Sequence, residues 1–154
     1  MQTTTALWAA TIILVFTLGI LTTITYQQLT PRELPPAPGD HISEDNIYQT
    51  NNTIIIKIDQ PFYLSKYTPT HSMLPLIEEG HNGIMIKPQG QDIQVGDIIS
   101  YKYDENTTIV HRVISIKKDK KGYYFITKGD NNPQQDPFKI RMENIQGILI
   151  GIIY

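Results

Sequence analysis

The first 31 residues of the chain contain no charged side chain, and this feature most limits what the chain can fold into. All 13 Lys or Arg residues and all 15 Asp or Glu residues lie from Arg32 onward. Within the uncharged part, Ala6 to Tyr26 is a run of 21 mostly apolar residues. At about 1.5 Å per residue, a helix of this length covers the roughly 30 Å of a bilayer core. The sequence therefore predicts a membrane-spanning helix, with residues 1–27 as an N-terminal anchor.

A cleaved signal peptide or a buried helix is the alternative interpretation of this segment. A signal peptide has a basic start, a shorter apolar core of about 7–15 residues and a small-residue exit. Here no Lys or Arg precedes the apolar run, and the run ends in TTITYQQLTP. These features favour an uncleaved anchor. Charge does not decide its orientation, because Arg32 is soon followed by acidic residues.

A proline-rich stretch separates the apolar run from the rest of the chain. Residues 31–40 read PRELPPAPGD, and the four prolines cannot continue a helix. We therefore interpret residues 28–50 as a semi-rigid spacer. Residues 51–154 contain short runs of β-branched and aromatic residues between turn signals, which predicts a compact β-barrel-like or sandwich domain. The predicted strands are Thr53–Ile58, Phe62–Lys66, Ile84–Lys87, Asp97–Tyr103, Ile109–Lys117, Tyr123–Lys128 and Ile145–Tyr154. The fold class is thus mainly β behind one N-terminal transmembrane helix.

Composition removes several classes of function. The net charge of −2 and the absence of a basic stripe argue against nucleic-acid binding. The chain has no cysteine, so a thiol nucleophile, a disulfide scaffold and a cysteine-based metal site are excluded. No HExxH, Walker A or dinucleotide-binding glycine pattern is present. We expect no metal and no organic cofactor, and a covalent hydrolase built on this chain would need Ser, Thr or Lys as its nucleophile.

Ser72 is the serine best placed to be exposed on the rim of a β domain. It lies in the segment Thr68-Pro69-Thr70-His71-Ser72-Met73-Leu74-Pro75, where prolines on both sides favour a turn. His71 is its neighbour, but adjacent residues of an extended segment point to opposite sides. His41 in the spacer and His81 in a GHNG turn are most simply surface residues.

His111 lies in the middle of a predicted strand of the hairpin IISYKYDENTTIVHRVISI. Strand alternation puts it on the same face as Ile109 and Val113, and Arg112 on the opposite face. A histidine on such a face is either a satisfied core residue or a base, and its position alone does not decide between them.

The loop Lys128-Gly129-Asp130-Asn131-Asn132-Pro133-Gln134-Gln135-Asp136 follows a predicted strand. Its carboxylates could cap a turn by bonding to local backbone. A calcium site is disfavoured, because most EF-hand ligands and the terminal Glu are missing. Both Asp130 and Asp136 remain candidates for a functional carboxylate.

Four segments, in their order along the chain, resemble type I signal peptidases, the membrane-anchored serine proteases that remove signal peptides from exported proteins. The segments are Thr70-His71-Ser72-Met73-Leu74-Pro75, Gln94-Val95-Gly96-Asp97-Ile98-Ile99, Ile109-Val110-His111-Arg112-Val113 and Thr127-Lys128-Gly129-Asp130-Asn131-Asn132, with a weaker match at Asn144-Ile145-Gln146-Gly147. His111 stands where the bacterial housekeeping enzymes have a lysine, so the chain is similar to the histidine type of archaea and the endoplasmic reticulum.

The resemblance implies a role for each matched residue. Ser72 would be the nucleophile and His111 the general base. Asp136 would complete a triad, with Asp130 as a supporting carboxylate. Thr70 and the Ser72 amide would form the oxyanion hole. His71 departs from the small residue that the family often has at this position.

The resemblance also implies a function. The protein would cut exported preproteins after a small-residue motif, and bind the substrate as an added β-strand. Its partners would be these preproteins, the lipid bilayer and the protein-export translocon, with no nucleic acid. The catalytic domain would lie on the extracytoplasmic side of the cell membrane, or the lumenal side of the endoplasmic reticulum in a eukaryote. The alternatives are a non-catalytic membrane-anchored β surface or adhesion domain, and a self-cleaving repressor of related fold.

Overall fold

A computed structural model describes residues 12–23, 34–89 and 93–154. The chain divides into two compact units, Met1–Leu34 and Pro35–Tyr154. In the first unit, residues 12–23 are helical. The remainder of the predicted anchor, and residues 28–33 of the predicted spacer, lie outside the described residues. In the described ranges, no helix is both long and apolar enough to span a membrane.

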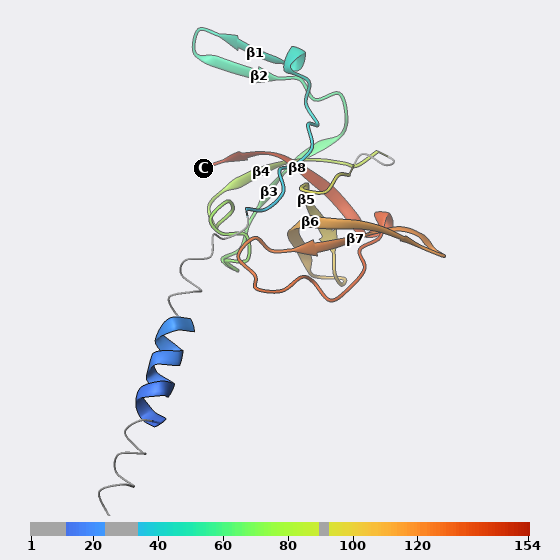
Figure 1. Ribbon diagram of the computed structural model, residues 1–154. Coiled ribbons are helices and arrows are strands. Elements are labelled where there is room, and N and C mark those ends of the chain that lie inside the picture. Colours follow the sequence, from blue (N-terminus) through green and yellow to red (C-terminus); the bar gives the residue numbers. More distant parts are fainter. Residues whose placement is uncertain (1–11, 24–33, 90–92) are drawn as a thin grey trace, which may run out of the picture. The chain divides into compact units, whose positions relative to one another are not determined.

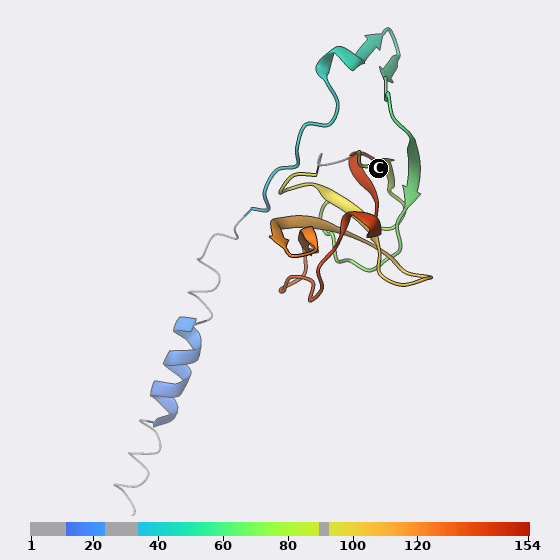
Figure 2. The same ribbon diagram turned by 90° about the vertical axis from the view of Figure 1, so that its right-hand side faces the viewer.

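The second unit is built from antiparallel strands (Figure 1). The described elements are η1 (Glu44–Asn46), β1 (Ile47–Thr50), β2 (Thr53–Ile56), β3 (Phe62–Lys66), β4 (Asn82–Ile86), β5 (Ile98–Lys102), β6 (Thr108–Asp119), β7 (Gly122–Lys128), η2 (Met142–Asn144) and β8 (Ile145–Ile153). Strands β1 and β2 form a hairpin, and the others form one sheet in the order β3-β4-β8-β5-β6-β7. Strands β3 (green) and β7 (orange) are the two edge strands of this sheet (Figure 2).

The prediction of a mainly β fold is confirmed, and each predicted run falls on a strand. The predicted hairpin is also confirmed: β5 and β6 pair with Ile99 opposite His111. Strand β1 was not predicted, because it falls within the residues interpreted as spacer. Among the described residues β1 pairs only with β2, and all four of its residues are exposed. Its sequence therefore lacks the alternation of apolar and polar residues by which a half-buried strand is predicted.

Two apolar clusters make up the core. The larger one contains Ile86, Ile93, Ile99, Tyr101, Val113, Phe125, Ile140 and Ile148. The smaller one contains Met73, Ile77, Met85, Ile98 and Leu149, with Val110 packed against it. Burial of an Ile or Met side chain stabilises a fold by about 1.5–3 kcal/mol. These clusters hold both strands of the β5–β6 hairpin, so the hairpin that carries His111 is a rigid part of the unit.

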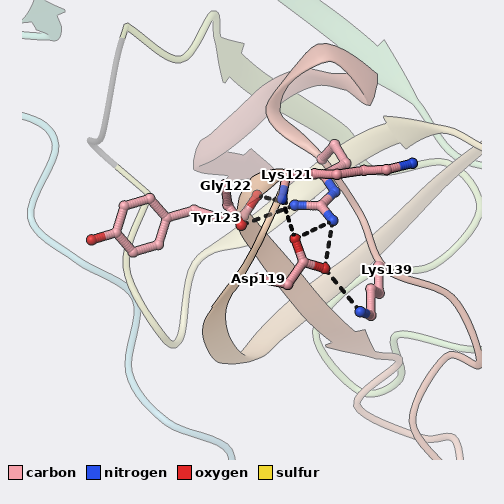
Figure 3. A network of polar contacts seen from close by, with 6 residues as sticks. Asp119, Lys121, Gly122, Tyr123 and Lys139 are labelled. Carbon is pink, nitrogen blue, oxygen red and sulfur yellow. Dashed lines mark hydrogen bonds and ion pairs between the residues drawn. The ribbon is translucent and has the colours of Figure 1, made fainter.

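An ion-pair network fixes the far end of the β6–β7 hairpin (Figure 3). Arg141 donates to both carboxylate oxygens of Asp119, at 2.8 and 2.7 Å, and Lys139 donates to Asp119 Oδ2 at 2.9 Å. Arg141 also donates to the carbonyl oxygens of Gly122 and Tyr123. The hydrogen bonds from Arg141 and Lys139 hold the pKa of Asp119 far below its usual value. The segment before η2 is thereby tied to the turn of the hairpin.

The pKa of Asp119 makes this contribution to stability depend on pH. Because the pKa is lower in the folded protein, ionised Asp119 stabilises the fold above its unfolded-state pKa of about 3.9, and this stabilisation is lost as the pH falls. We expect Asp119→Asn to lower Tm at pH 7 and to approach wild type below about pH 4. Thermal unfolding at several pH values tests this, with Glu105→Gln as an exposed control. Equal Tm values at pH 7 would show that the network does not stabilise the fold.

Candidate active site

Ser72 lies in the turn between β3 and β4 and is half-buried. His71, just before it, adopts a φ of 58°, in the left-handed region that non-glycine residues seldom occupy. The side chain of His71 contacts Glu78, with 3.4 Å between Nδ1 and Oε1. Thr70 Oγ1 lies 3.3 Å from Ser72 Oγ. The backbone thus turns sharply at Ser72 and brings the Thr70 and Ser72 hydroxyls together.

The loop that follows β7 holds this turn in place. The backbone N–H of Asn131 donates to the carbonyl oxygen of Ser72 at 2.9 Å, and Asn131 Nδ2 donates to the carbonyl oxygen of His71 at 3.1 Å. A Cβ on Gly129 would lie 2.6 Å from that same Ser72 oxygen, closer than real side chains approach. Only glycine therefore fits at position 129. Two of the matched segments meet here, although they lie about 60 residues apart.

His111 is buried on β6, with its residue 7% exposed. Its Nδ1 lies 2.7 Å from Asp136 Oδ2. An ionised carboxylate can only accept hydrogen bonds, so Nδ1 is the donor. In the neutral ring, Nε2 is then the unprotonated nitrogen, which is the atom able to accept a proton.

Asp136 receives two further hydrogen bonds at the same oxygen. Thr127 Oγ1 donates to Oδ2 at 2.6 Å and Tyr101 OH donates at 2.9 Å. Burial raises the pKa of Asp136, but the hydrogen bonds from His111, Thr127 and Tyr101 outweigh it and hold the pKa below its usual value. Burial raises the pKa of the Tyr101 phenol, so that this hydroxyl stays protonated and can donate. Asp136 is therefore an anion near neutral pH.

Sequence reasoning missed Tyr101 and Thr127. Tyr101 shares the inward face of its strand with Ile99. Thr127, to which no role was assigned, is the first residue of the matched segment Thr127-Lys128-Gly129-Asp130-Asn131-Asn132. Both positions are fully buried. A hydroxyl at an inward-facing strand position indicates a buried hydrogen bond. The sequence does not show that the acceptor of this bond is the carboxylate of Asp136.

Asp130 has a different partner from Asp136. Arg112 donates to both of its carboxylate oxygens, from Nε at 2.8 Å and from Nη2 at 2.7 Å. Arg112 Nη1 donates to the carbonyl oxygen of Gly96 at 2.8 Å and to that of Pro36 at 3.2 Å. The carboxylate bonded to His111 is thus that of Asp136, and Asp130 is ion-paired to the neighbouring arginine.

Ser72 and His111 do not hydrogen-bond to each other among the residues that the structure describes. They are connected through packing instead: Met73, directly after Ser72, is in the smaller core cluster with Ile98, and Val110 packs against that cluster. Ile98 pairs with Arg112 across the hairpin. The serine turn therefore packs against the strands that carry the imidazole. Hydrogen bonds of a catalytic group are often long in the absence of substrate.

The described ranges contain no group of three or more His, Cys, Asp or Glu side chains suited to a metal ion. The described residues instead contain a buried imidazole bonded to an anionic carboxylate, and a serine turn that packs against the same hairpin. These are the chemical types from which covalent serine hydrolases are built.

Comparison with protein families gives a match over most of the β unit. The model described as "Putative amidase domain" matches residues 48–152, which is more than half of the chain. The protein therefore belongs to this family. The family differs from the one that the ordered segments resemble.

Signal peptidase I W of Bacillus subtilis (strain 168) is 36% identical to this chain over 61 residues. The match covers 40% of this chain and 32% of that protein, so it spans about a third of the relative's length. No solved structure matches the chain. Amidases and peptidases both hydrolyse an amide C–N bond, and the two comparisons together support a hydrolase.

The buried pair of Arg112 and Asp130 yields a prediction about stability. Both side chains are less than one tenth exposed, at 6% and 8%. Removing the charge of one partner leaves the other buried and uncompensated, which costs about 3–5 kcal/mol. We expect Asp130→Asn to lower the free energy of unfolding by this amount in urea denaturation. Glu79→Gln, at an exposed position, is the control; if the two variants unfold at the same urea concentration, the pair is not a stabilising contact.

Proposed function

We propose that the protein is a serine endopeptidase that removes N-terminal signal peptides from exported preproteins. In this proposal Ser72 is the nucleophile, His111 the general base and Asp136 the carboxylate that orients it. The observation that carries the proposal is the buried 2.7 Å contact between His111 Nδ1 and Asp136 Oδ2. The order of the matched segments and the likeness to a bacterial signal peptidase support the substrate class.

The reaction would begin with proton transfer from Ser72 Oγ to His111 Nε2, as Oγ bonds to the carbonyl carbon of the scissile peptide. Asp136 would stabilise the imidazolium that forms, because it is an anion held by three donors. The imidazolium would then protonate the leaving amine as the C–N bond breaks. Water, deprotonated by His111, would hydrolyse the acyl-enzyme and regenerate Ser72.

The oxyanion would be bound beside Ser72. The Ser72 backbone N–H and the Thr70 hydroxyl are the candidate donors, and each donor of this kind stabilises the transition state by about 3–4 kcal/mol. The position of Thr70 Oγ1, 3.3 Å from Ser72 Oγ, supports this role.

The substrate would bind as an added strand. β3 leads into the serine turn and is an edge strand of the sheet in the part of the chain that the structure describes (Figure 2). An extended peptide could pair with the edge of β3 that faces away from β4. Residues 1–27 would anchor the enzyme in the bilayer, with the catalytic unit on the extracytoplasmic side, or the lumenal side in a eukaryote. The export translocon would deliver the preproteins there.

A non-catalytic surface domain is the second candidate. The β1–β2 hairpin favours it, because Ile54 is 71% exposed and the neighbouring apolar residues Ile47, Ile55 and Ile56 are more than 40% exposed. Such a domain would not require a buried histidine bonded to an anionic carboxylate. The hairpin could instead be a binding surface added to an enzyme.

The first test of the proposal is the nucleophile. We expect Ser72→Ala to lower the rate of preprotein cleavage in detergent by at least about 10³-fold, because no hydroxyl remains to form the acyl-enzyme. Ser115→Ala removes a serine on the same strand as His111 and is the matched control. Cleavage by Ser72→Ala at the wild-type rate would show that Ser72 is not the nucleophile, and absence of cleavage by the wild-type protein would favour the surface domain.

The second test separates the two histidines near the turn. We expect His111→Ala to lower kcat by about 10³-fold or more, and His71→Ala to retain most of the activity, because His71 contacts Glu78 instead. The wild-type rate should also fall at acid pH, since a protonated imidazole cannot accept the serine proton. Loss of activity in His71→Ala alone, or a flat pH profile down to about pH 4, would mean that His111 is not the base.

A further inference from the structure

Residues 36–41 of the predicted spacer are hydrogen-bonded to the rest of the β unit, and we refer to them as the strap. The unit that contains the sheet begins at Pro35, so the strap belongs to it. The attachment point is Asp97, in the turn before β5. Asp97 is fully buried, which is unusual for a carboxylate and requires that its oxygens be hydrogen-bonded.

Asp97 binds the strap with both of its oxygens. Oδ1 accepts the backbone N–H of Gly39 at 2.8 Å, and Oδ2 lies 3.0 Å from His41 Nε2. Oδ2 also accepts the backbone N–H of Gln94 at 2.7 Å. An ionised carboxylate only accepts, so Nε2 of His41 is the donor. The His41 side chain is 9% exposed, and its bond to Asp97 is thus largely shielded from water.

The strap also passes too close to Gly96 for any side chain there. Gly96 has a φ of 105°, and a Cβ on it would lie 1.8 Å from the carbonyl oxygen of Ala37. Glycine is therefore needed at position 96 for its backbone conformation and for the approach of the strap. The matched segment Gly96-Asp97 thus has a local structural purpose, which is to seat residues 36–41.

The strap is connected to the candidate active site through Arg112. Nη1 of this arginine donates to the carbonyl oxygen of Pro36 in the strap and to that of Gly96 beneath it. Its Nε and Nη2 donate to the carboxylate of Asp130. The next residue, Asn131, donates hydrogen bonds to the carbonyl oxygens of His71 and Ser72. The links are hydrogen bonds joined by short stretches of backbone, namely residues 36–41 and the peptide bond between Asp130 and Asn131, so a continuous path leads from His41 to the serine turn.

We propose that the strap is part of the active-site scaffold and that His41 is a positioning residue for Ser72. This inference rests on the proposed function, since it concerns the geometry of the proposed nucleophile. His41 fixes the strap on Asp97, and the strap supplies one of the two carbonyl oxygens that hold Arg112 Nη1. Without this support, the Arg112 fork and the loop at Asn131 lose part of their fixed orientation. A small displacement of a reacting group can reduce the rate by up to about 10²-fold.

The test compares His41→Ala, His41→Gln and Glu44→Gln in the full-length protein in detergent. Gln can return a side-chain N–H near the position of His Nε2, whereas Ala cannot. Glu44→Gln changes an exposed residue of η1, outside the strap, and is the matched control. Two quantities are measured: hydrogen exchange of the Gly39 amide, and kcat and KM for preprotein cleavage.

We expect His41→Ala to speed exchange of the Gly39 amide and to lower kcat by about 10-fold with KM little changed, because the nucleophile and not the substrate site is displaced. His41→Gln should restore both values, and Glu44→Gln should leave both at the wild-type level. Unchanged exchange in His41→Ala would show that His41 does not hold the strap. Faster exchange with unchanged kcat would show that the strap does not position the site.

These outcomes are distinct from failure of the proposed function. Exchange of the Gly39 amide reports the docking of the strap without any substrate. If the wild-type protein cleaves no preprotein, the proposed function is wrong and the positioning role falls with it, even where exchange shows the strap to be docked.

Discussion

The buried ion pair between Arg112 and Asp130 is the contact on which most of this architecture depends. One guanidinium reaches three separate parts of the chain: the strap at Pro36, the turn at Gly96 and the loop after β7. Arginine suits this position because its planar fork presents several N–H donors in fixed directions. A lysine could not bind both oxygens of a carboxylate and two carbonyl oxygens in the same way. The strap, the turn at Gly96 and the loop after β7 are held together because the Arg112 side chain donates hydrogen bonds to all three.

Strand alternation explains why two aspartates of one loop have different partners. His111 and Arg112 are neighbours on β6 and therefore point to opposite faces of the sheet. The loop after β7 provides Asp130 to the arginine and Asp136 to the histidine. The guanidinium of Arg112 and the imidazole of His111 are thus each bonded to a separate carboxylate. The candidate base, His111, and the arginine that supports the serine turn are adjacent in the sequence.

Local sequence patterns predicted much of this structure, and long-range partners account for what they missed. The strands and the β5–β6 hairpin follow from residue types and turn signals, and the matched segments identified Ser72, His111 and both aspartates as candidates. The choice of Asp136 as the partner of His111, and the donors Tyr101 and Thr127, depend on how β5, β6 and β7 pack. The docking of the strap was not predicted. Prolines indicate that a segment is stiff, but they do not indicate which residues it contacts.

The contact between His41 and Asp97 joins positions 56 residues apart, which has a consequence for the order in which the protein assembles. The strap leaves the ribosome well before the strands that bind it, and closing so long a loop costs more entropy than forming a local hairpin. The serine turn also precedes its partner Asn131 in synthesis. The contact chain at the candidate active site can therefore close only after β7 and the following loop have been made.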